Sequence, residues 1–506
     1  MSYRRSIIER DLSGFVSNNI SEIGGMVIRA SKGPKTPVKC RSEEDVLTYF
    51  GYPSSSYPDV FEAVSFVRES ECWIAAPYGS DALYGGVDVS SGTITAFSTG
   101  RDYDSWEYGE SSGLISHSFF SRSPQTDDLS VKVKSITGKQ FKLSLYKTST
   151  LGSTFITDYN YSLDRELDKF GKSLYIEDVF DNNKYLLFKV NAATSVTAYN
   201  LPGVTAVSFA GGSRGSAPQA SDINTAWENF YFANKYQAKI LMDPIGGYDT
   251  KINTIIQTYQ KYAHGISVIA LGSDADEAIA ARQLSAIDSD NISYYTNWAR
   301  IEDPYNNSSA WISHIGSIGK KYAMMEDTYD ALSPAGIDEN NHGGQLSDWK
   351  VLEVENDYSD TDLQNLDEAQ LNPIILDQNY GLMVYGDKTA QVSNSDTSFV
   401  GTRRLYNYII DTIDKQILRQ QEFKLNDATH RFKAQSMTQT FLEPIINQGY
   451  LRDALAVCDE TNNTDDVLER RQFILDVYVK VTPNSQFVTL RLTRLSQTQT
   501  VAEFIG

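Results

Sequence analysis

The feature that most constrains the fold is a strand, a helix and a second strand in the middle of the chain. Apolar strands are predicted at Lys239 to Met242 and Ile266 to Leu271, with a helix at roughly Tyr248 to Ala263 between them. Antiparallel neighbouring strands can be joined by a short hairpin turn, whereas parallel neighbouring strands need a longer crossover, which is usually a helix. We therefore expect an α/β unit with a mainly parallel sheet.

A similar alternation opens the chain. A strand is predicted at Met26 to Ala30, and the turn Lys32 to Pro34 ends it. Ser42 caps a first helix, a second helix follows at Pro58 to Glu69, and a strand at Cys72 to Ala76 comes next. This first part of the chain therefore also predicts α/β layers.

Between these two α/β segments the pattern changes to short alternating strands. Strands at Leu129 to Val133, Gln140 to Leu145 and Lys184 to Val190 indicate a β-rich insertion. The loop Gly211 to Gly215 follows it and precedes a helix that we expect Asp222 to cap, so it could cradle an anion. We favour an interdomain turn, because the loop lacks GxGxxG spacing.

Near the carboxy terminus, apolar spacing predicts a helix and a hairpin. Residues Thr402 to Gln420 have apolar side chains three and four positions apart, so one helix face is buried. A β-hairpin with a turn at Thr482 to Ser485 follows. Its apolar residues are Phe473, Leu475, Val477, Val479 and Val481 in the first strand and Val488, Leu490 and Leu492 in the second.

Both chain ends contain strand-compatible segments without a partner nearby in sequence. Residues 1–22 are polar apart from a β-prone patch, and residues 496–506 continue beyond the hairpin. The β-prone residues are Ile7 and Ile8 at the start and Thr498, Thr500 and Val501 at the end. Unpaired strands expose backbone N–H and C=O groups that seek partners elsewhere.

The composition disfavours several classes of function. Lys and Arg total 45 against 65 Asp and Glu, and the formal charge of −20 argues against direct binding of nucleic acid. We expect no membrane span, because the apolar stretches are short, and no signal peptide. Cys40, Cys72 and Cys458 are far apart in sequence, and we expect reduced, mostly buried thiols.

The sequence lacks motifs for chemistry, so we expect no catalytic residue, cofactor or metal. Gly316 to Lys320 is too short for a phosphate loop, and the five histidines lack metal-ligand spacing. The run Asp459 to Asp466 resembles a calcium loop without its central glycine, and turns closed by Asx hydrogen bonds explain it better. Residues 353–368 hold seven acids and no base, which we interpret as a solvated loop leading into a helix.

Three motifs late in the chain carry a resemblance to a known family. They are Tyr385 to Ala390 (YGDKTA), Arg403 to Asn407 (RRLYN) and Cys458 to Asn463 (CDETNN), and the predicted hairpin follows them. In this order and spacing they resemble the core region of contractile tail-sheath proteins, closest to those of T-even-type phages. Weaker similarity extends upstream through Ser333 to Gly336 and Tyr175 to Phe180 and into the first segment.

The resemblance implies a multidomain α/β and α+β chain with a discontinuous core domain made from both chain ends. The implied division is an N-terminal linking arm (1–22), a first core segment (23–90), a β-rich insertion domain (91–204), an α/β middle domain (205–345), a C-terminal core segment (346–494) and a C-terminal linking arm (495–506). In such sheaths the extended arms add strands to a sheet in neighbouring molecules, which agrees with the unpaired segments at both ends.

The resemblance also implies a function and partners. The chain would be a structural subunit that polymerises helically around a tail tube and contracts to drive the tube through the host envelope. Its partners would be further copies of itself, the tube protein, and baseplate and tail terminator proteins, without direct nucleic-acid or membrane contact. It would be located in the virion tail after assembly in the host cytoplasm.

The implied site residues are those of subunit linkage. The arms would contribute Ile7, Ile8, Thr498, Thr500 and Val501, and the hairpin that receives neighbouring strands would contribute Phe473, Leu475, Val477, Val488, Leu490 and Leu492. Arg403 and Arg404 begin a helix that resembles the tube-facing element of the family, so they either contact the tube or hold packing within the core domain. The sequence departs from the family in lacking the Pro-Gly of many amino-terminal arms.

Two alternatives stay open at this point. The first is a sheath subunit of a bacterial contractile injection system, of the type VI or extracellular kind, which genomic neighbours would distinguish. The second is an α/β hydrolase-like enzyme built on residues 205–340. The enzyme predicts a pocket with a converging nucleophile and base, whereas a sheath predicts surface helices without one.

Overall fold

The computed structural model describes residues 22–109, 113–125, 128–149, 152–181, 183–327, 333–337 and 343–483. The chain forms two compact units, Met1–Thr412 and Ile413–Gly506. Both predicted linking arms lie outside the described residues, except Glu22. The second strand of the predicted terminal hairpin also lies outside them.

The first unit is built on an eight-stranded sheet in the order β19-β18-β14-β13-β12-β1-β3-β2. Its strands are β1 (Gly24–Val27), β2 (Val38–Cys40), β3 (Cys72–Ala75), β12 (Ile240–Asp243), β13 (His264–Val268), β14 (Ile292–Thr296), β18 (Leu371–Asp377) and β19 (Gly381–Val384). The inner six strands run parallel, and the edge strands β2 and β19 are antiparallel. The predicted parallel βαβ arrangement is therefore confirmed.

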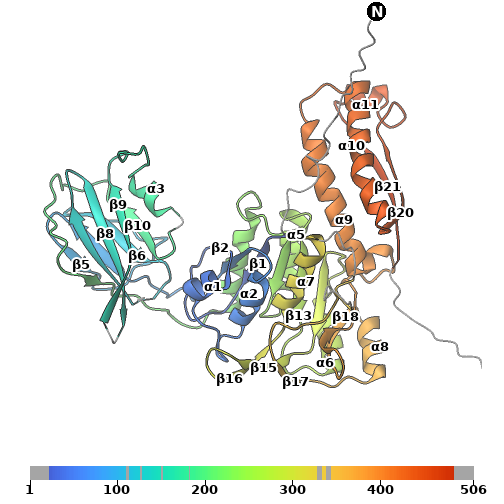
Figure 1. Cartoon of the computed structure of the whole chain (residues 1–506), viewed down its shortest axis with the longest axis horizontal. Coiled ribbons are helices and arrows are strands. Elements are labelled where there is room, and N and C mark those ends of the chain that lie inside the picture. The colour runs from blue at the N-terminus through green and yellow to red at the C-terminus, as the bar shows by residue number, and fades with distance from the viewer. Residues whose placement is uncertain are drawn as a thin grey trace, which may run out of the picture. The chain divides into compact units, whose positions relative to one another are not determined.

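Helices cover both faces of this sheet (Figure 1). They are α1 (Glu43–Phe50), α2 (Asp59–Val67), α4 (Ala220–Glu228), α5 (Asp249–Thr258), α6 (Ala275–Ser285), α7 (Ile315–Asp327) and α8 (Asp360–Glu368). Met26 belongs to the core under α1, α2 and α7, whereas its neighbour Val27 belongs to the core under the other helices. Because successive strand residues point to opposite faces, an apolar strand fills both cores.

The strands of three predicted segments share this one sheet, because β18 of the predicted C-terminal core segment pairs with β14 of the predicted middle domain. Strand β1, from the predicted first core segment, pairs with β12, from the predicted middle domain, with Gly24 opposite Ile240. The domain boundaries themselves stay a prediction. Sequence patterns could not assign this pairing, because two buried parallel strands look alike whether they lie in one sheet or in two.

The cap of the helix that follows the glycine-rich loop differs from the prediction. Gln219, not Asp222, is the residue that precedes helix α4. Asp222 instead accepts the backbone N–H of Gln219 at 2.8 Å as the acidic member of a capping box. The helix then ends in a short 3-10 turn, η3 (Asn229–Tyr231).

The β-rich insertion consists of two four-stranded antiparallel sheets, β10-β6-β4-β5 and β11-β7-β8-β9. Their strands are β4 (Gly86–Ser90), β5 (Ile94–Ala96), β6 (Ile115–Ser121), β7 (Leu129–Ser135), β8 (Gln140–Ser149), β9 (Gly152–Ser162), β10 (Leu186–Val190) and β11 (Val207–Ser208), with helix α3 (Ile176–Phe180) beside them. Phe119, Phe141 and Leu143 are fully buried in the core that the two sheets share. The predicted strands of the insertion are thus present.

The first unit also contains a small three-stranded sheet and ends with a helix. The sheet has the order β16-β15-β17, from β15 (Ala299–Asp303), β16 (Ser308–Ile312) and β17 (Val351–Val354). A 3-10 turn, η4 (Asp396–Ser398), precedes helix α9 (Val400–Thr412), with which the unit ends. The predicted helix at Thr402 to Gln420 thus begins as α9.

The second unit continues that helix and adds a two-stranded sheet. Its elements are the π-helix η5 (Ile413–Ile417), the 3-10 turn η6 (Leu418–Gln420), α10 (Ala428–Asn447), β20 (Leu451–Val457), α11 (Asp465–Glu469) and β21 (Asp476–Val481). Strands β20 and β21 pair antiparallel, with Leu455 opposite Tyr478. Among the helices that the structure describes, none has the length and apolar content needed to cross a bilayer.

Candidate assembly sites

Strand β21 is the described part of the predicted strand-receiving hairpin, and it pairs with β20. Val477 lies in β21, opposite Ala456, whereas Phe473 and Leu475 precede the strand and are half-buried. Along β21, half-buried Val477 and Val479 alternate with exposed Tyr478 and Lys480. The predicted alternation is therefore present, but the strand is shorter and its described partner lies upstream in sequence.

Glutamines of α10 cover the outer edge of β20. Gln439 donates from Nε2 to the carbonyl of Ala454 at 3.3 Å and accepts the N–H of Ala456 at 3.2 Å. Gln435 accepts the N–H of Cys458 at 3.4 Å. These backbone groups are the ones that an added strand would need on this edge, so the glutamine side chains occupy the place of a neighbouring strand.

The CDETNN motif follows β20 directly and lies in the connection between β20 and β21. Asn463 is buried, donates to the carbonyl of Ile474 at 2.8 Å and accepts its N–H at 2.9 Å, which imitates a strand pair. Asn462 donates to Asp476 at 2.9 Å, and Asp459 accepts the N–H of Thr461 at 2.8 Å. The interpretation of this run as Asx turns is confirmed. The hydrogen bonds of the motif also fix the residues that lead into β21.

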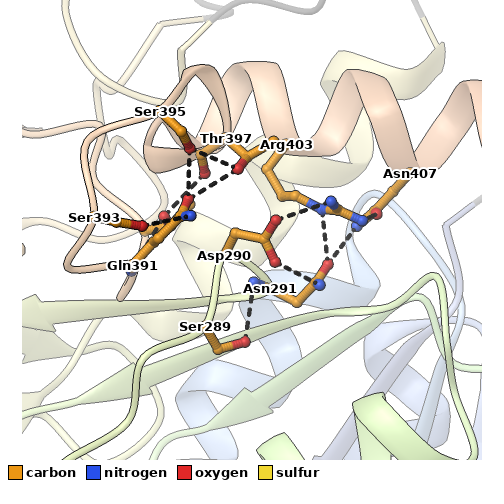
Figure 2. Close-up of polar contacts among 10 residues, drawn as sticks. Ser289, Asp290, Asn291, Gln391, Ser393, Ser395, Thr397, Arg403 and Asn407 are labelled. Atoms are coloured by element: carbon orange, nitrogen blue, oxygen red, sulfur yellow. Dashed lines mark hydrogen bonds and ion pairs between the residues drawn. The ribbon is translucent and has the colours of Figure 1, made fainter.

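The RRLYN motif anchors α9 to the loop before β14 (Figure 2). Arg403 pairs with Asp290 at 2.9 Å and donates to Asn291 Oδ1 at 3.1 Å. Asn407, one turn later, donates to the same Asn291 oxygen at 3.0 Å. Beside them, Ser395 and other side chains of the loop before α9 form a second polar cluster around Gln391 (Figure 2).

Arg404 points into the interior of the first unit. Its side chain is 7% exposed and pairs with Glu22 Oε2 at 2.7 Å. Its guanidinium carbon lies 4.4 Å from the centre of the Tyr322 ring. The contacts of Arg403 and Arg404 within the chain favour the alternative that they hold packing within the core, and tube contact by these residues stays an untested prediction.

The YGDKTA motif fixes the start of α9. The carbonyl of Asp387 accepts the N–H of Val400 at 3.2 Å, and Asn372 of β18 donates to the carbonyl of Lys388 at 2.8 Å. Thr389 donates its N–H to the carbonyl of Ser398 at 2.9 Å. Two of the three family motifs therefore tie α9 to the parallel sheet, YGDKTA through β18 and RRLYN through the loop before β14.

The carboxyl ends of β1 and β12 mark the place where an enzyme of this topology would bind its ligand, because the strand order reverses there. Arg29 forms an ion pair with Asp59 at 2.8 Å. Asp243 accepts the N–H groups of Gly246 and Tyr248 at 3.1 and 3.0 Å, and burial raises its pKa to about 6. Arg29 and Asp243 thus find partners within the chain.

The glycine-rich loop after the insertion contributes to the same region. Arg214 donates to the carbonyl of Ser31 at 3.0 Å and to the hydroxyl of Tyr57 at 2.6 Å. Ser213 pairs with Leu83 as an isolated bridge. The loop thus pairs with the chain that enters the insertion, and its role as an interdomain turn stays a prediction.

Among the described residues, potential metal ligands are not clustered. No cluster of three or more His, Cys, Asp or Glu side chains in the described ranges is arranged to hold a metal ion. The three cysteines are free and buried, as predicted. Cys40 and Cys72, far apart in sequence, are opposite neighbours in the pairing of β2 with β3.

No sequence pattern pointed to Gln435 and Gln439 of α10, which cover β20, or to Glu22. Their roles depend on partners 15 to 382 positions away in the chain. A polar residue on a helix looks the same whether it faces water or a strand edge. Only the fold could identify them.

Solved structures show the class to which this fold belongs. A sheath tail protein of Listeria innocua superposes with a TM-score of 0.55 at 10% identity, over 91% of this chain and 95% of that one. The helical sheath of the anti-feeding prophage in its contracted state gives a TM-score of 0.53 at 12% identity, over 98% of this chain and 99% of that one. The chain has the fold of contractile-sheath proteins.

Sequence comparison narrows the class further. The chain is 30% identical over 225 residues to the tail sheath protein of Vibrio phage KVP40 and 24% identical over 371 residues to that of Enterobacteria phage T4. These matches cover 43% and 67% of this chain, and the chain spans 32% and 53% of those relatives. The predicted resemblance to tail-sheath proteins of T4-like phages is confirmed. No protein-family model matches the chain.

Proposed function

We propose that this chain is a structural subunit of a contractile phage tail sheath. Copies polymerise helically around the tail tube and contract to drive the tube through the host envelope. The similarity to the T4 tail sheath protein over 371 residues carries this proposal. The sheath fold over almost the whole chain supports it.

The proposed mechanism stores free energy in contacts between subunits. Head-to-tail contacts between identical copies generate an open helix when the rotation does not close. Contraction is a rigid-body change between two packings, with the terminal arms as tethers between copies. The polar contacts that Arg29 and Asp243 make within the chain agree with a rigid body better than with a hydrolase site.

Strand exchange in this proposal uses one edge of the β20–β21 pair. The arm of a neighbouring copy adds beyond β21, on the side where the predicted strand with Val488, Leu490 and Leu492 follows. The β20 edge is closed to it because Gln435 and Gln439 occupy the backbone groups there. Tube, baseplate and terminator proteins are the further proposed partners, in a virion tail assembled in the host cytoplasm.

Deletion of residues 1–12 tests this proposal. The variant should fold, with the thermal unfolding of the full chain, but should fail to form tubes under conditions where the full chain does so. Electron microscopy and analytical ultracentrifugation of both proteins give the readout. Sheaths of normal length from the shortened chain would refute the linking arm.

A further inference from the structure

One face of the β-rich insertion is basic and aromatic. In the sheet β11-β7-β8-β9, buried residues such as Val131 and Leu143 alternate with residues on the opposite face. That opposite face carries Lys132 and Lys134 of β7, Lys142 and Tyr146 of β8, and Phe155 of β9. We call these five residues the lysine face.

The lysine face lacks a cover within the part of the chain that the structure describes, whereas the other sheet of the insertion has one. Tyr103 and Trp106 pack on Phe120 of β6. Tyr108 donates to Ser118 at 2.8 Å. Phe155, by contrast, is 53% exposed.

The positive charge of the lysine face is only partly neutralised. Lys142 pairs with Asp158 at 2.6 Å, and both side chains are at least one third exposed. Lys132 lies 5.0 Å from the ring centre of Tyr146. Among the described residues, no carboxylate lies within ion-pair distance of Lys132 or Lys134.

Exposed acids at helices α6 and α8 carry the opposite charge. Helices α6 and α8 pack against each other (Figure 1). Asp276 of α6 and Asp357, Asp360 and Glu368 at α8 are exposed, and none has a basic partner within ion-pair distance among the described residues. We call these four residues, with the 85% exposed Leu284 of α6, the acidic face.

We propose that the lysine face of one copy docks on the acidic face of a second copy of this chain. The inference rests on the proposed polymerisation and names one contact within it. A chain that carries two different complementary faces makes head-to-tail contacts, which suit an open helix. The aromatic pair Tyr146 and Phe155 then meets Leu284, so apolar burial accompanies the charge pairing.

Salt dependence follows from the exposed position of these charges. Ion pairs between exposed side chains are screened within about 8 Å at physiological ionic strength. Raising NaCl from about 0.05 M to about 0.5 M should therefore weaken this contact.

Zero-length cross-linking tests the contact directly. Unlabelled and 15N-labelled full-length chains are mixed, assembled and treated with a carbodiimide, which joins a lysine to a carboxylate that touches it. Mass spectrometry should find mixed-isotope peptides that join Lys132, Lys134 or Lys142 to Asp276, Asp357, Asp360 or Glu368. Tubes without such peptides overturn this contact and leave the proposed function intact. Failure of the full chain to form tubes overturns the proposed function, and the contact with it.

Charge reversal gives a second readout. The double variant Lys132→Glu with Lys134→Glu should need about tenfold more protein to assemble, which corresponds to the loss of a few exposed charge pairs. Lys169→Glu with Lys172→Glu, exposed in the same insertion, is the matched control and should assemble normally. Adding Asp276→Lys and Asp360→Lys to the first variant should restore assembly. Equal behaviour of the two lysine variants would overturn the proposal.

Discussion

At the residue scale, a few buried charges hold the first unit together. Glu62 of α2 is 1% exposed and accepts the N–H groups of His314 and Gly316 at 2.7 and 2.8 Å, and so caps the start of α7. Gly316 is required there, because a Cβ would lie 1.9 Å from the carbonyl oxygen of Glu62. Helices α2 and α7 therefore approach more closely than larger residues would allow.

Glu62→Gln should change the pH dependence of stability. Burial raises the pKa of Glu62 from 4.5 to about 7, so the folded protein keeps this proton to a higher pH than the unfolded chain does. The free energy of unfolding should therefore fall as pH rises from about 4.5 to about 7. Glu62→Gln should flatten this fall, measured by urea denaturation at several pH values.

The glutamine variant should also be less stable at pH 5, by about 1–3 kcal/mol, because the amide group cannot accept both backbone N–H groups. A smaller slope should persist, because the pKa of Asp243 is raised to about 6 as well. Glu69→Gln, exposed just after α2, is the control with no expected effect. An unchanged slope in Glu62→Gln would contradict the assignment.

Substitution of the two neighbouring arginines of α9 should lower the free energy of unfolding by different amounts. Arg404→Ala leaves Glu22 buried without its partner and should reduce the free energy of unfolding by about 3–5 kcal/mol. Arg403→Ala removes a more exposed pair and should cost about 1 kcal/mol. Urea denaturation of both variants measures this difference. Equal losses in the free energy of unfolding would mean that the Arg404–Glu22 pair is solvated.

At the element scale, the helix α10 protects the edge of β20. In Gln439→Ala, the N–H of Ala456 loses its acceptor, so its hydrogen exchange should accelerate about tenfold or more. The open edge should also promote irregular association beyond ordered tubes. Ser436→Ala on the exposed side of α10 is the matched control, and an unchanged exchange rate at Ala456 would contradict the role of Gln439.

At the scale of the whole molecule, the first unit contains all strands of the parallel sheet and its own cores. A chain that ends at Thr412 should therefore unfold cooperatively, as followed by circular dichroism during heating. It should not form tubes by itself, because it lacks β20 and β21. A noncooperative transition would show that the first unit depends on the second.

The sequence by itself determined the element types, the parallel sheet, the β-rich insertion and the resemblance to tail-sheath proteins. Apolar periodicity and turn residues act over a few positions, so they can be read locally. The motifs were visible too, but their physical roles were not. For Arg404 the sequence left both tube contact and core packing open, because its partner Glu22 is 382 positions away.

Tertiary structure alone decided which strands share a sheet and which polar groups face each other. The pairing of β1 with β12 and the cover of β20 by Gln439 both join distant segments. Such contacts depend on where the whole backbone places each group, because a hydrogen bond forms only at about 3 Å and with suitable direction. The lysine face and the acidic face likewise exist only in the folded chain, because each combines residues of different strands or helices.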